Sequence, residues 1–175
     1  MNAATMPLEE IAGEAAAFRD SFRTLHLATT AADGTPNASY APFALSDAGH
    51  PQIYVSELAA HTANLQRGAA VSALLIEAEQ DAEHLFARRR LTLSCTPWPC
   101  PRGSDAFARV LANLEARFGE FMRYLRTLED FHAFELRPHH ATYVRGFAQA
   151  YEFPGGDLQA IRHINDRGHL AAKEA

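Results

Sequence analysis

The first part of the chain carries hydrophobic residues at helical spacing. Apolar side chains recur every three or four positions with charged residues between them: Ile11, Ala15, Phe18 and Phe22. This spacing predicts an amphipathic helix that begins at Pro7 and makes residues 1–24 an N-terminal helical segment. A proline in the first turn fits the same direction, because its missing N–H costs nothing there.

After residue 24 the pattern changes to short runs rich in β-branched and aromatic residues. The first strands are predicted over residues 25–30, 37–45 and 52–56. Asp33-Gly34 lies between the first two runs and is a strong hairpin signal. Connections this short cannot hold a parallel crossover, so an antiparallel meander is expected. Pro42 favours an edge or a bulge in the second strand.

Helices and strands then alternate. A short helix over residues 57–68 is predicted to place Leu58, His61 and Leu65 on one face and to stop at Gly68. Four further strands are predicted, over residues 71–77, 91–95, 131–136 and 141–151. Residues 96–103 are rich in proline and are predicted to form a loop.

The longest helix is predicted to follow that loop. Ser104 is its expected N-cap, and an apolar stripe from Phe107 to Leu125 is expected to pack into the core. Seven short strands with two or three helices predict an α+β fold, a small antiparallel barrel with flanking helices. No linker or internal repeat divides the chain, so residues 1–175 are expected to form one domain that ends in a polar tail over residues 152–175.

Composition narrows the partners. The chain has 47% hydrophobic and 21% charged residues, which is typical of a globular protein. A net charge of −5 argues against nucleic acid, because phosphate binding needs clustered positive charge. No apolar run reaches the length of a transmembrane helix, and the N-terminus lacks the basic region of a signal peptide, so we expect no membrane partner and a cytoplasmic location.

The polar tail is the first candidate for chemistry. Five charged or imidazole side chains fall within eight positions of it: Arg162, His163, Asp166, Arg167 and His169. Imidazole binds metals and haem iron, and a guanidinium binds carboxylates such as haem propionates. The competing interpretation is a solvated terminus, because chain ends collect polar residues.

Two further positions offer binding groups. Arg88 and Arg90 precede a predicted strand and would share one face of an extended run, where they would form an anion seat. The alternative is a charged edge that blocks aggregation. His61 is either a half-buried structural imidazole or a binding residue.

The other histidines and the cysteines are expected to be inert. His139-His140 is placed in a turn as a solvated pair, because adjacent side chains do not share a helix face and offer no metal spacing. Cys95 and Cys100 are expected to be reduced thiols, although Cys100 could offer a thiolate to haem iron. The chain contains no Gly-rich phosphate loop, nucleophile elbow or His-Glu-x-x-His motif.

These motifs together resemble a known family. The motifs Leu27-Ala-Thr-Thr-x-x-Asp-Gly-x-Pro36, Ser39-x-x-Pro-Phe43, Tyr54-Val-Ser56 and Leu58-x-x-His61-x-x-Asn64-Leu65 are similar to the split barrel of pyridoxamine 5′-phosphate oxidase-like proteins. The second half resembles the haem-utilisation branch, the HutZ/HugZ-like proteins. The motifs there are Phe86-Ala-Arg-Arg-Arg90, Arg117-Phe-Gly119, Asp130-Phe131, Tyr143-Val-x-Gly-Phe-x-x-Ala-Tyr151 and the tail.

The resemblance implies a homodimeric split β-barrel that binds haem at the subunit interface. It implies oxidative cleavage of haem to a biliverdin-like product with release of iron, driven by O2 and an unidentified electron donor. His169 would be the axial iron ligand, with His163 as the alternative, and Asp130 would accept a hydrogen bond from the ligand's other nitrogen. Arg90, with Arg88 beside it, would face the haem, and His61 would line the same interface.

Two other functions remain open at this stage. One is an FMN-binding oxidoreductase of the pyridoxamine 5′-phosphate oxidase-like type. It would need cationic side chains near the flavin phosphate. Between residues 52 and 71 the one arginine is Arg67, and there is no lysine. The other is a haem carrier or storage protein without catalysis, which would need the same haem-binding residues.

Overall fold

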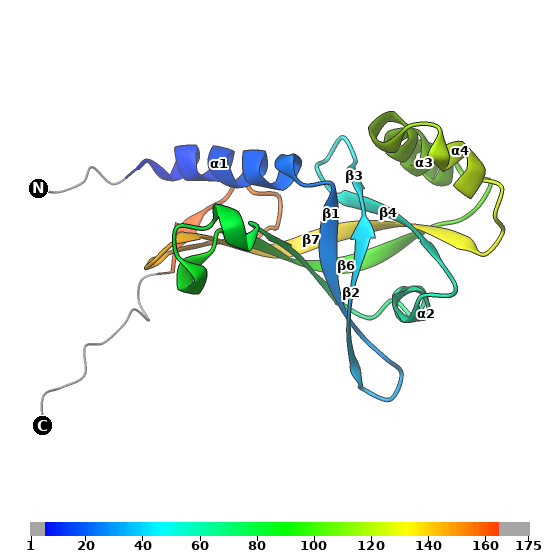
Figure 1. The fold of residues 1–175 in the computed structure, drawn as a ribbon, viewed down its shortest axis with the longest axis horizontal. Coiled ribbons are helices and arrows are strands. Elements are labelled where there is room, and N and C mark those ends of the chain that lie inside the picture. Colours follow the sequence, from blue (N-terminus) through cyan, green and yellow to red (C-terminus); the bar gives the residue numbers. More distant parts are fainter. Residues whose placement is uncertain (1–5, 165–175) are drawn as a thin grey trace, which may run out of the picture.

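The computed structural model describes residues 6–164, which form one mainly antiparallel sheet with helices packed on it (Figure 1). The strands are β1 (Thr24–Thr30), β2 (Pro36–Pro42), β3 (Ala44–Leu45), β4 (Pro51–Ser56), β5 (Val71–Ile76), β6 (Arg90–Cys100), β7 (Phe131–Gly146), β8 (Gln149–Phe153) and β9 (Arg162–His163). Their order is β2-β1-β5-β6-β7-β4-β3, with β8 paired to β7 and β9 paired to β8. The mixed fold with a split antiparallel barrel is confirmed, and two of its strands are only two residues long.

The helices are α1 (Leu8–Ser21), α2 (Ala60–Gln66), α3 (Asp105–Phe118) and α4 (Phe121–Leu125), with 3-10 turns η1 (Glu79–Asp81) and η2 (Leu85–Ala87). The predicted stripe of α1 is confirmed, because Ile11, Ala15 and Phe18 are buried. None of the helices within residues 6–164 combines the length and the apolar character needed to cross a membrane.

The β1–β2 hairpin forms as predicted, with Thr30 opposite Pro36 and Gly34 at a positive φ of 87° in the turn. The predicted meander is wrong after this hairpin, because the next strand does not pair with β2. After Pro42 the chain crosses to the other edge of the sheet, where β3 pairs with β4 and β4 pairs with β7. Phe43 makes this crossing and is fully buried, so it anchors the chain where the two sheet edges approach each other.

The prediction of a loop for the Pro-rich residues 96–103 is also wrong as far as Cys100. β6 continues through this segment to Cys100 and pairs with β7, with a bulge between Ser94 and Cys95. Strand β5 ends its pairing with β6 at Cys95, so the second half of β6 has a neighbour on one side only. Prolines are tolerated there because they need no partner for an N–H group. Pro97 and Pro99 lie two residues apart, so their nitrogens face the same side, the one without a neighbouring strand.

Strand β7 replaces two predicted strands and the turn between them. It runs from Phe131 through His139 and His140 to Gly146 without a break. The placement of the histidine pair in a turn is therefore wrong: His140 lies opposite Ser94 of β6. The cause is long-range pairing, since β6 pairs with β7 on both sides of His139 and β8 pairs with it from Ala141 onward.

Two predicted helices are shorter than expected. Leu58 precedes α2 and is 93% exposed, so it does not share the buried face of His61 and Leu65. Ser104 caps α3 as predicted, with its hydroxyl accepting from Phe107 N at 3.2 Å. The helix ends at Gly119, whose φ is 79°, and α4 begins two residues later.

The hydrophobic residues form two cores. The larger fills the barrel beneath α1, with Phe43, Phe134, Tyr143 and Phe153 among its largest buried side chains. The smaller lies between the sheet and α3, where Phe107, Val110, Leu111 and Leu114 pack on Tyr54 and Ala133. These cores fix the strand ends that carry the polar residues described next.

Candidate functional site

The candidate residues fall at two ends of the long β6–β7 ribbon. At one end Arg90 pairs with Val144, and at the other Cys100 pairs with Ala133, close to Asp130. Ten residues of strand separate Arg90 from Cys100, which corresponds to roughly 33 Å. Figure 1 shows the same separation: the segment before β7 lies at the end with α2 and α4, and the β7–β8 turn lies at the other end.

Asp130 is half-buried and held at the point where β4 ends and β7 begins. Its Oδ2 accepts a hydrogen bond from the Ser56 hydroxyl at 2.7 Å. Its backbone carbonyl accepts from Glu57 N at 2.8 Å. Within residues 6–164 the second carboxylate oxygen, Oδ1, has no hydrogen-bond partner. Asp130 therefore presents a fixed carboxylate with one accepting oxygen available.

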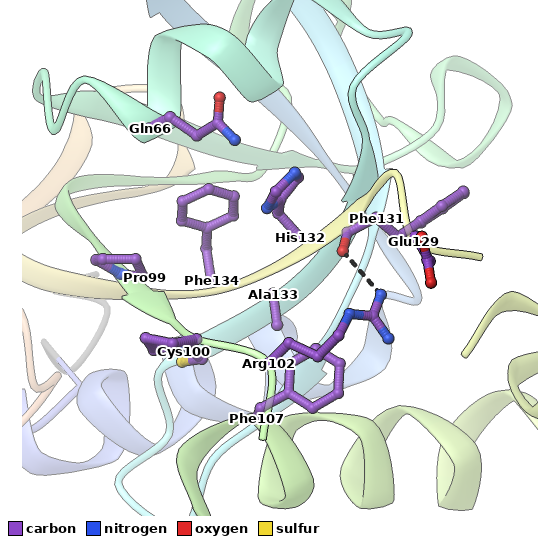
Figure 2. Close-up of a pocket in the computed structure, with 11 residues that line it drawn as sticks. Gln66, Pro99, Cys100, Arg102, Phe107, Glu129, Phe131, His132, Ala133 and Phe134 are labelled. Carbon is purple, nitrogen blue, oxygen red and sulfur yellow. Dashed lines mark hydrogen bonds between the residues drawn. The ribbon is translucent and has the colours of Figure 1, made fainter. Parts of the chain in front are cut away.

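A hollow of about 290 Å³ is lined by Glu129 and Phe131, the two sequence neighbours of Asp130 (Figure 2). Its lining is mostly apolar and includes Phe107, Phe131 and Phe134, with Cys100, Arg102, Glu129 and His132 as its main polar groups. Arg102 is fully engaged: its guanidinium donates to Leu128 O at 2.7 Å and to Tyr54 Oη at 3.1 Å. The hollow thus offers a mainly apolar surface, with the titratable side chains of Glu129 and His132 on either side of Asp130 in the sequence.

His132 is a residue that the sequence reasoning missed. Its Nε2 lies 2.6 Å from Glu57 Oε1, in the segment that also holds Asp130. The available signal was its position two residues after Asp130 at the start of a strand, where side chains i and i+2 share a face. Ser56 was missed as well, because its contact with Asp130 joins positions 74 residues apart.

His61 is buried, with 7% of its surface exposed. Its Nδ1 lies 2.9 Å from the Ser39 hydroxyl, while its Nε2 is buried without a partner in the described residues. Burial lowers the pKa of His61, because desolvation disfavours the charged imidazolium. His61 is therefore a neutral imidazole, and one of its nitrogens has no hydrogen-bond partner in the described residues. A purely structural histidine would have both nitrogens paired, so His61 stays a candidate binding residue.

The three consecutive arginines have different partners. Strand β6 begins only at Arg90, so the extended run that was expected to align Arg88 with Arg90 is absent. Arg88 donates from Nε to the Glu77 carbonyl at 3.0 Å, and Arg89 Nε pairs with the Glu77 carboxylate at 3.0 Å. Arg90 contacts only the Arg88 carbonyl, at 3.1 Å, and has no carboxylate partner in the described part of the chain. Of the three, Arg90 keeps its charge available for an external anion.

His163 is part of the sheet. Strand β9 places it opposite Tyr151, and the two rings pack edge to face with centroids 4.6 Å apart. Its Nδ1 is buried without a partner, and neighbouring Arg162 pairs with Glu152. His169, the residue expected to bind haem iron, lies outside residues 6–164, as do Asp166 and Arg167.

Burial disfavours a competing thiolate at either cysteine. Both are buried and free, as expected. Burial raises the pKa of Cys95 to about 12, and burial likewise raises the pKa of Cys100. Cys100 Sγ faces the Trp98 carbonyl at 3.7 Å. Both side chains are therefore thiols at neutral pH, which counts against Cys100 as a ready thiolate ligand.

Comparison with known proteins gives a consistent family. A model for pyridoxamine 5′-phosphate oxidase matches residues 11–145. Haem oxygenase HutZ from Vibrio cholerae is 41% identical over 152 residues, which cover 87% of this chain and 85% of that protein.

Similarity to solved structures points to the same family. The crystal structure of HutZ from Vibrio cholerae, described as a haem storage protein, has a TM-score of 0.68 at 41% identity and covers 76% of this chain and 91% of its own. ChuZ from Campylobacter jejuni has a TM-score of 0.83 at 26% identity and covers 98% of this chain and 70% of its own.

Proposed function

Since this chain belongs to the pyridoxamine 5′-phosphate oxidase family, in the branch that contains HutZ, we propose that it binds haem and degrades it oxidatively to a biliverdin-like product with release of iron. The observation that carries the proposal is Asp130, a carboxylate fixed by Ser56 with one oxygen left to accept a hydrogen bond. A carboxylate in that position orients a metal-ligating imidazole and raises its basicity.

The proposed site needs residues from both ends of the β6–β7 ribbon, and covalent geometry limits how they can meet. Ile164 donates to Ala150 O at 2.8 Å, and Ala150 pairs with Val144. Along β7, Val144 and Phe131 are separated by roughly 40 Å. The peptide links from residue 164 to residue 169 span at most about 18 Å.

Five peptide links are therefore too few to span that distance within one chain, which supports a site shared between two protomers. We propose a homodimer in which the tail of one protomer reaches the Asp130 region of its partner, so that each haem lies between two protomers. This arrangement also explains why the polar groups at each end of the ribbon are incomplete. Asp130 has an open acceptor, and Arg90 has no counter-ion among the described residues.

Each residue then has a defined task. His169 would supply the nitrogen ligand of the haem iron, and Asp130 would accept a hydrogen bond from the N–H of that ring. Arg90 donates to a haem propionate, because a guanidinium matches a carboxylate in charge and shape. His61 would line the proposed interface with a buried imidazole whose Nε2 has no partner in the described residues. Bound haem supplies the redox-active iron, and O2 and an unidentified donor supply oxidant and electrons.

Arg88 and His163 keep smaller parts in the proposal. Arg88 supports the segment before β6 through the Glu77 carbonyl, so its effect on haem passes through the position of Arg90. His163 packs on Tyr151 and starts the tail at a fixed place in the sheet. It remains the alternative axial ligand.

Two other functions have specific support. A haem carrier is the second candidate, because the HutZ crystal structure is described as that of a storage protein. An FMN enzyme is the third, on the family model alone. The cation that a flavin phosphate would need after β4 is Arg67, and its guanidinium already donates to Asn64 Oδ1 at 3.0 Å and to the Thr30 carbonyl.

One experiment separates the three. The purified protein is titrated with hemin and, separately, with FMN, and ascorbate is then added to the haem complex in air. A saturable Soret band that bleaches with release of iron supports the oxygenase. A Soret band that stays stable supports a carrier, and bound FMN without any Soret band contradicts both haem functions.

A further inference from the structure

Ser56 holds the carboxylate on which the haem proposal depends. Its hydroxyl lies 2.7 Å from Asp130 Oδ2, across 74 residues of sequence. We propose that Ser56 is a positioning residue, whose hydroxyl fixes the Asp130 carboxylate so that Oδ1 faces the imidazole that binds iron. This inference rests on the proposed haem function and adds the group that sets the geometry of its hydrogen-bonding carboxylate.

The direction of the Ser56 hydrogen bond is set by its second contact. Ser56 Oγ accepts from the backbone N–H of Leu58 at 3.2 Å, so a lone pair of the oxygen is occupied on that side. An ionised carboxylate can only accept. The hydroxyl hydrogen therefore points to Asp130 Oδ2, which leaves Oδ1 as the carboxylate oxygen without a partner in the described residues and open to the imidazole N–H.

The backbone makes the same residue rigid. Ser56 is the last residue of β4 and pairs with Phe131, the first residue of β7. Its carbonyl accepts from the Thr62 hydroxyl at 2.5 Å, which ties it to α2. The next residue, Glu57, donates to the Asp130 carbonyl at 2.8 Å. Hydrogen bonds thus fix Asp130 at two places: Ser56 holds its side chain, and Glu57 holds its main chain.

Without the hydroxyl, the carboxylate would be free to rotate among its rotamers, because only its backbone would stay fixed. A misdirected carboxylate weakens the hydrogen bond to the ligating imidazole and lowers ligand basicity. The iron–histidine bond reports this change directly. A purely structural serine would alter only stability, so the two roles give different readouts.

The test compares four variants with the wild type as full-length protein loaded with hemin. Ser56→Ala removes the hydroxyl, Ser56→Thr keeps it, Asp130→Asn removes the negative charge, and the double variant combines Ser56→Ala with Asp130→Asn. Ser46→Ala is the matched control, because Ser46 also accepts from a backbone N–H, that of His50 at 3.2 Å, but does so at the other end of β4. Hemin affinity, the iron–histidine stretching frequency of the ferrous complex and the rate of ascorbate-driven bleaching are measured.

We expect Ser56→Ala to bind hemin as the wild type does, to lower the iron–histidine frequency and to slow bleaching by about tenfold. Ser56→Thr should restore both, and the double variant should be no slower than Asp130→Asn, because the two residues act as one unit. A wild-type frequency and rate in Ser56→Ala, or additive losses in the double variant, would overturn the inference.

The frequency measurement keeps the two proposals distinguishable. A wild-type protein without a saturable Soret band refutes the haem function and, with it, the role of Ser56. A wild-type protein that binds hemin but does not bleach it refutes only the oxygenase. The iron–histidine frequency of Ser56→Ala still decides the positioning role in that case.

Discussion

Tyr143 of β7 and Glu14 of α1 join the N-terminal helix to the barrel: the phenol donates to Glu14 Oε1 at 2.7 Å. Tyr143 is fully buried, and Arg145 Nε donates to the other carboxylate oxygen of Glu14 at 2.7 Å. One glutamate on a helix that begins the domain therefore bonds two residues of a strand near its end. This contact fixes α1 over the sheet near the end of β7 that carries β8 and β9.

The first prediction concerns this contact. Tyr143→Phe keeps the ring but removes the donor to Glu14, so the free energy of unfolding should fall by about 1 to 2 kcal/mol. Burial, followed by the bond to Glu14, raises the pKa of Tyr143 above its usual value of 10.0. Above pH 10 the unfolded chain therefore loses this proton more easily than the folded one, and stability declines as pH rises further. Urea melts at pH 7 and above pH 10 test both effects, and a wild-type alkaline decline in Tyr143→Phe would contradict the second.

The second prediction separates the neighbouring arginines. Arg90 has no carboxylate partner in the described residues, whereas Arg88 already donates to the Glu77 carbonyl. Arg90→Gln should weaken hemin binding by about tenfold or more, because a charge-assisted bond to a propionate is lost. Arg88→Gln should lower thermal stability with a smaller effect on affinity. Hemin titration and thermal melts test this, with Arg109→Gln on α3 as the control for a lost surface charge. Equal losses of hemin affinity in both variants would instead support the anion seat that the sequence predicted for Arg88 and Arg90 together.

A third prediction follows from the buried imidazole of His61. Its pKa is lowered by burial, so the folded protein disfavours the proton that the unfolded chain accepts below its ordinary value of 6.5. The stability from neutral His61 is therefore present above pH 6.5 and is lost as pH falls toward the lowered folded pKa. His61→Gln should flatten the stability profile between pH 7 and pH 5 in urea melts. A profile parallel to that of the wild type would show that His61 is not the group responsible.

The sequence predicted the elements that depend on local signals. The Asp33-Gly34 hairpin, the Ser104 cap and the α1 stripe were confirmed, because turn chemistry, capping and periodicity act between residues close in the chain. The wrong predictions depend on distant partners. The Pro-rich half of β6 is a strand because β7 pairs with it, and His139 lies in β7 because its neighbours continue the ladder.

The candidate site shows the same limit. The residue pattern singled out Arg90 and His61, and the family resemblance added Asp130, but neither could show the partners of these residues. Ser56 and Asp130 are 74 residues apart, and the pairing of β4 with β7 brings them to 2.7 Å. The free charge of Arg90 was hidden for the same reason, since it depends on Glu77 engaging Arg88 and Arg89 across a chain turn.

The last prediction tests whether each site draws on two protomers. Asp130→Asn should retain much of the hemin binding but lose most of the turnover, because the haem ligand stays while its acceptor loses its charge. His169→Ala should lose the axial ligand and with it the Soret band, whereas His163→Ala should keep both band and turnover. The reverse behaviour of the two histidine variants would assign the ligand to His163.

Mixed dimers then decide the arrangement. When equal amounts of His169→Ala and Asp130→Asn protomers are unfolded and refolded together, about half of the dimers contain one of each. Such a dimer has one site with an intact histidine from one protomer and an intact aspartate from the other, provided that each site is shared. Bleaching should therefore recover to about a quarter of the wild-type rate, although each variant alone is nearly inactive. If His169 and Asp130 served haem within a single protomer, every site in the mixture would lack one of them and no activity would return.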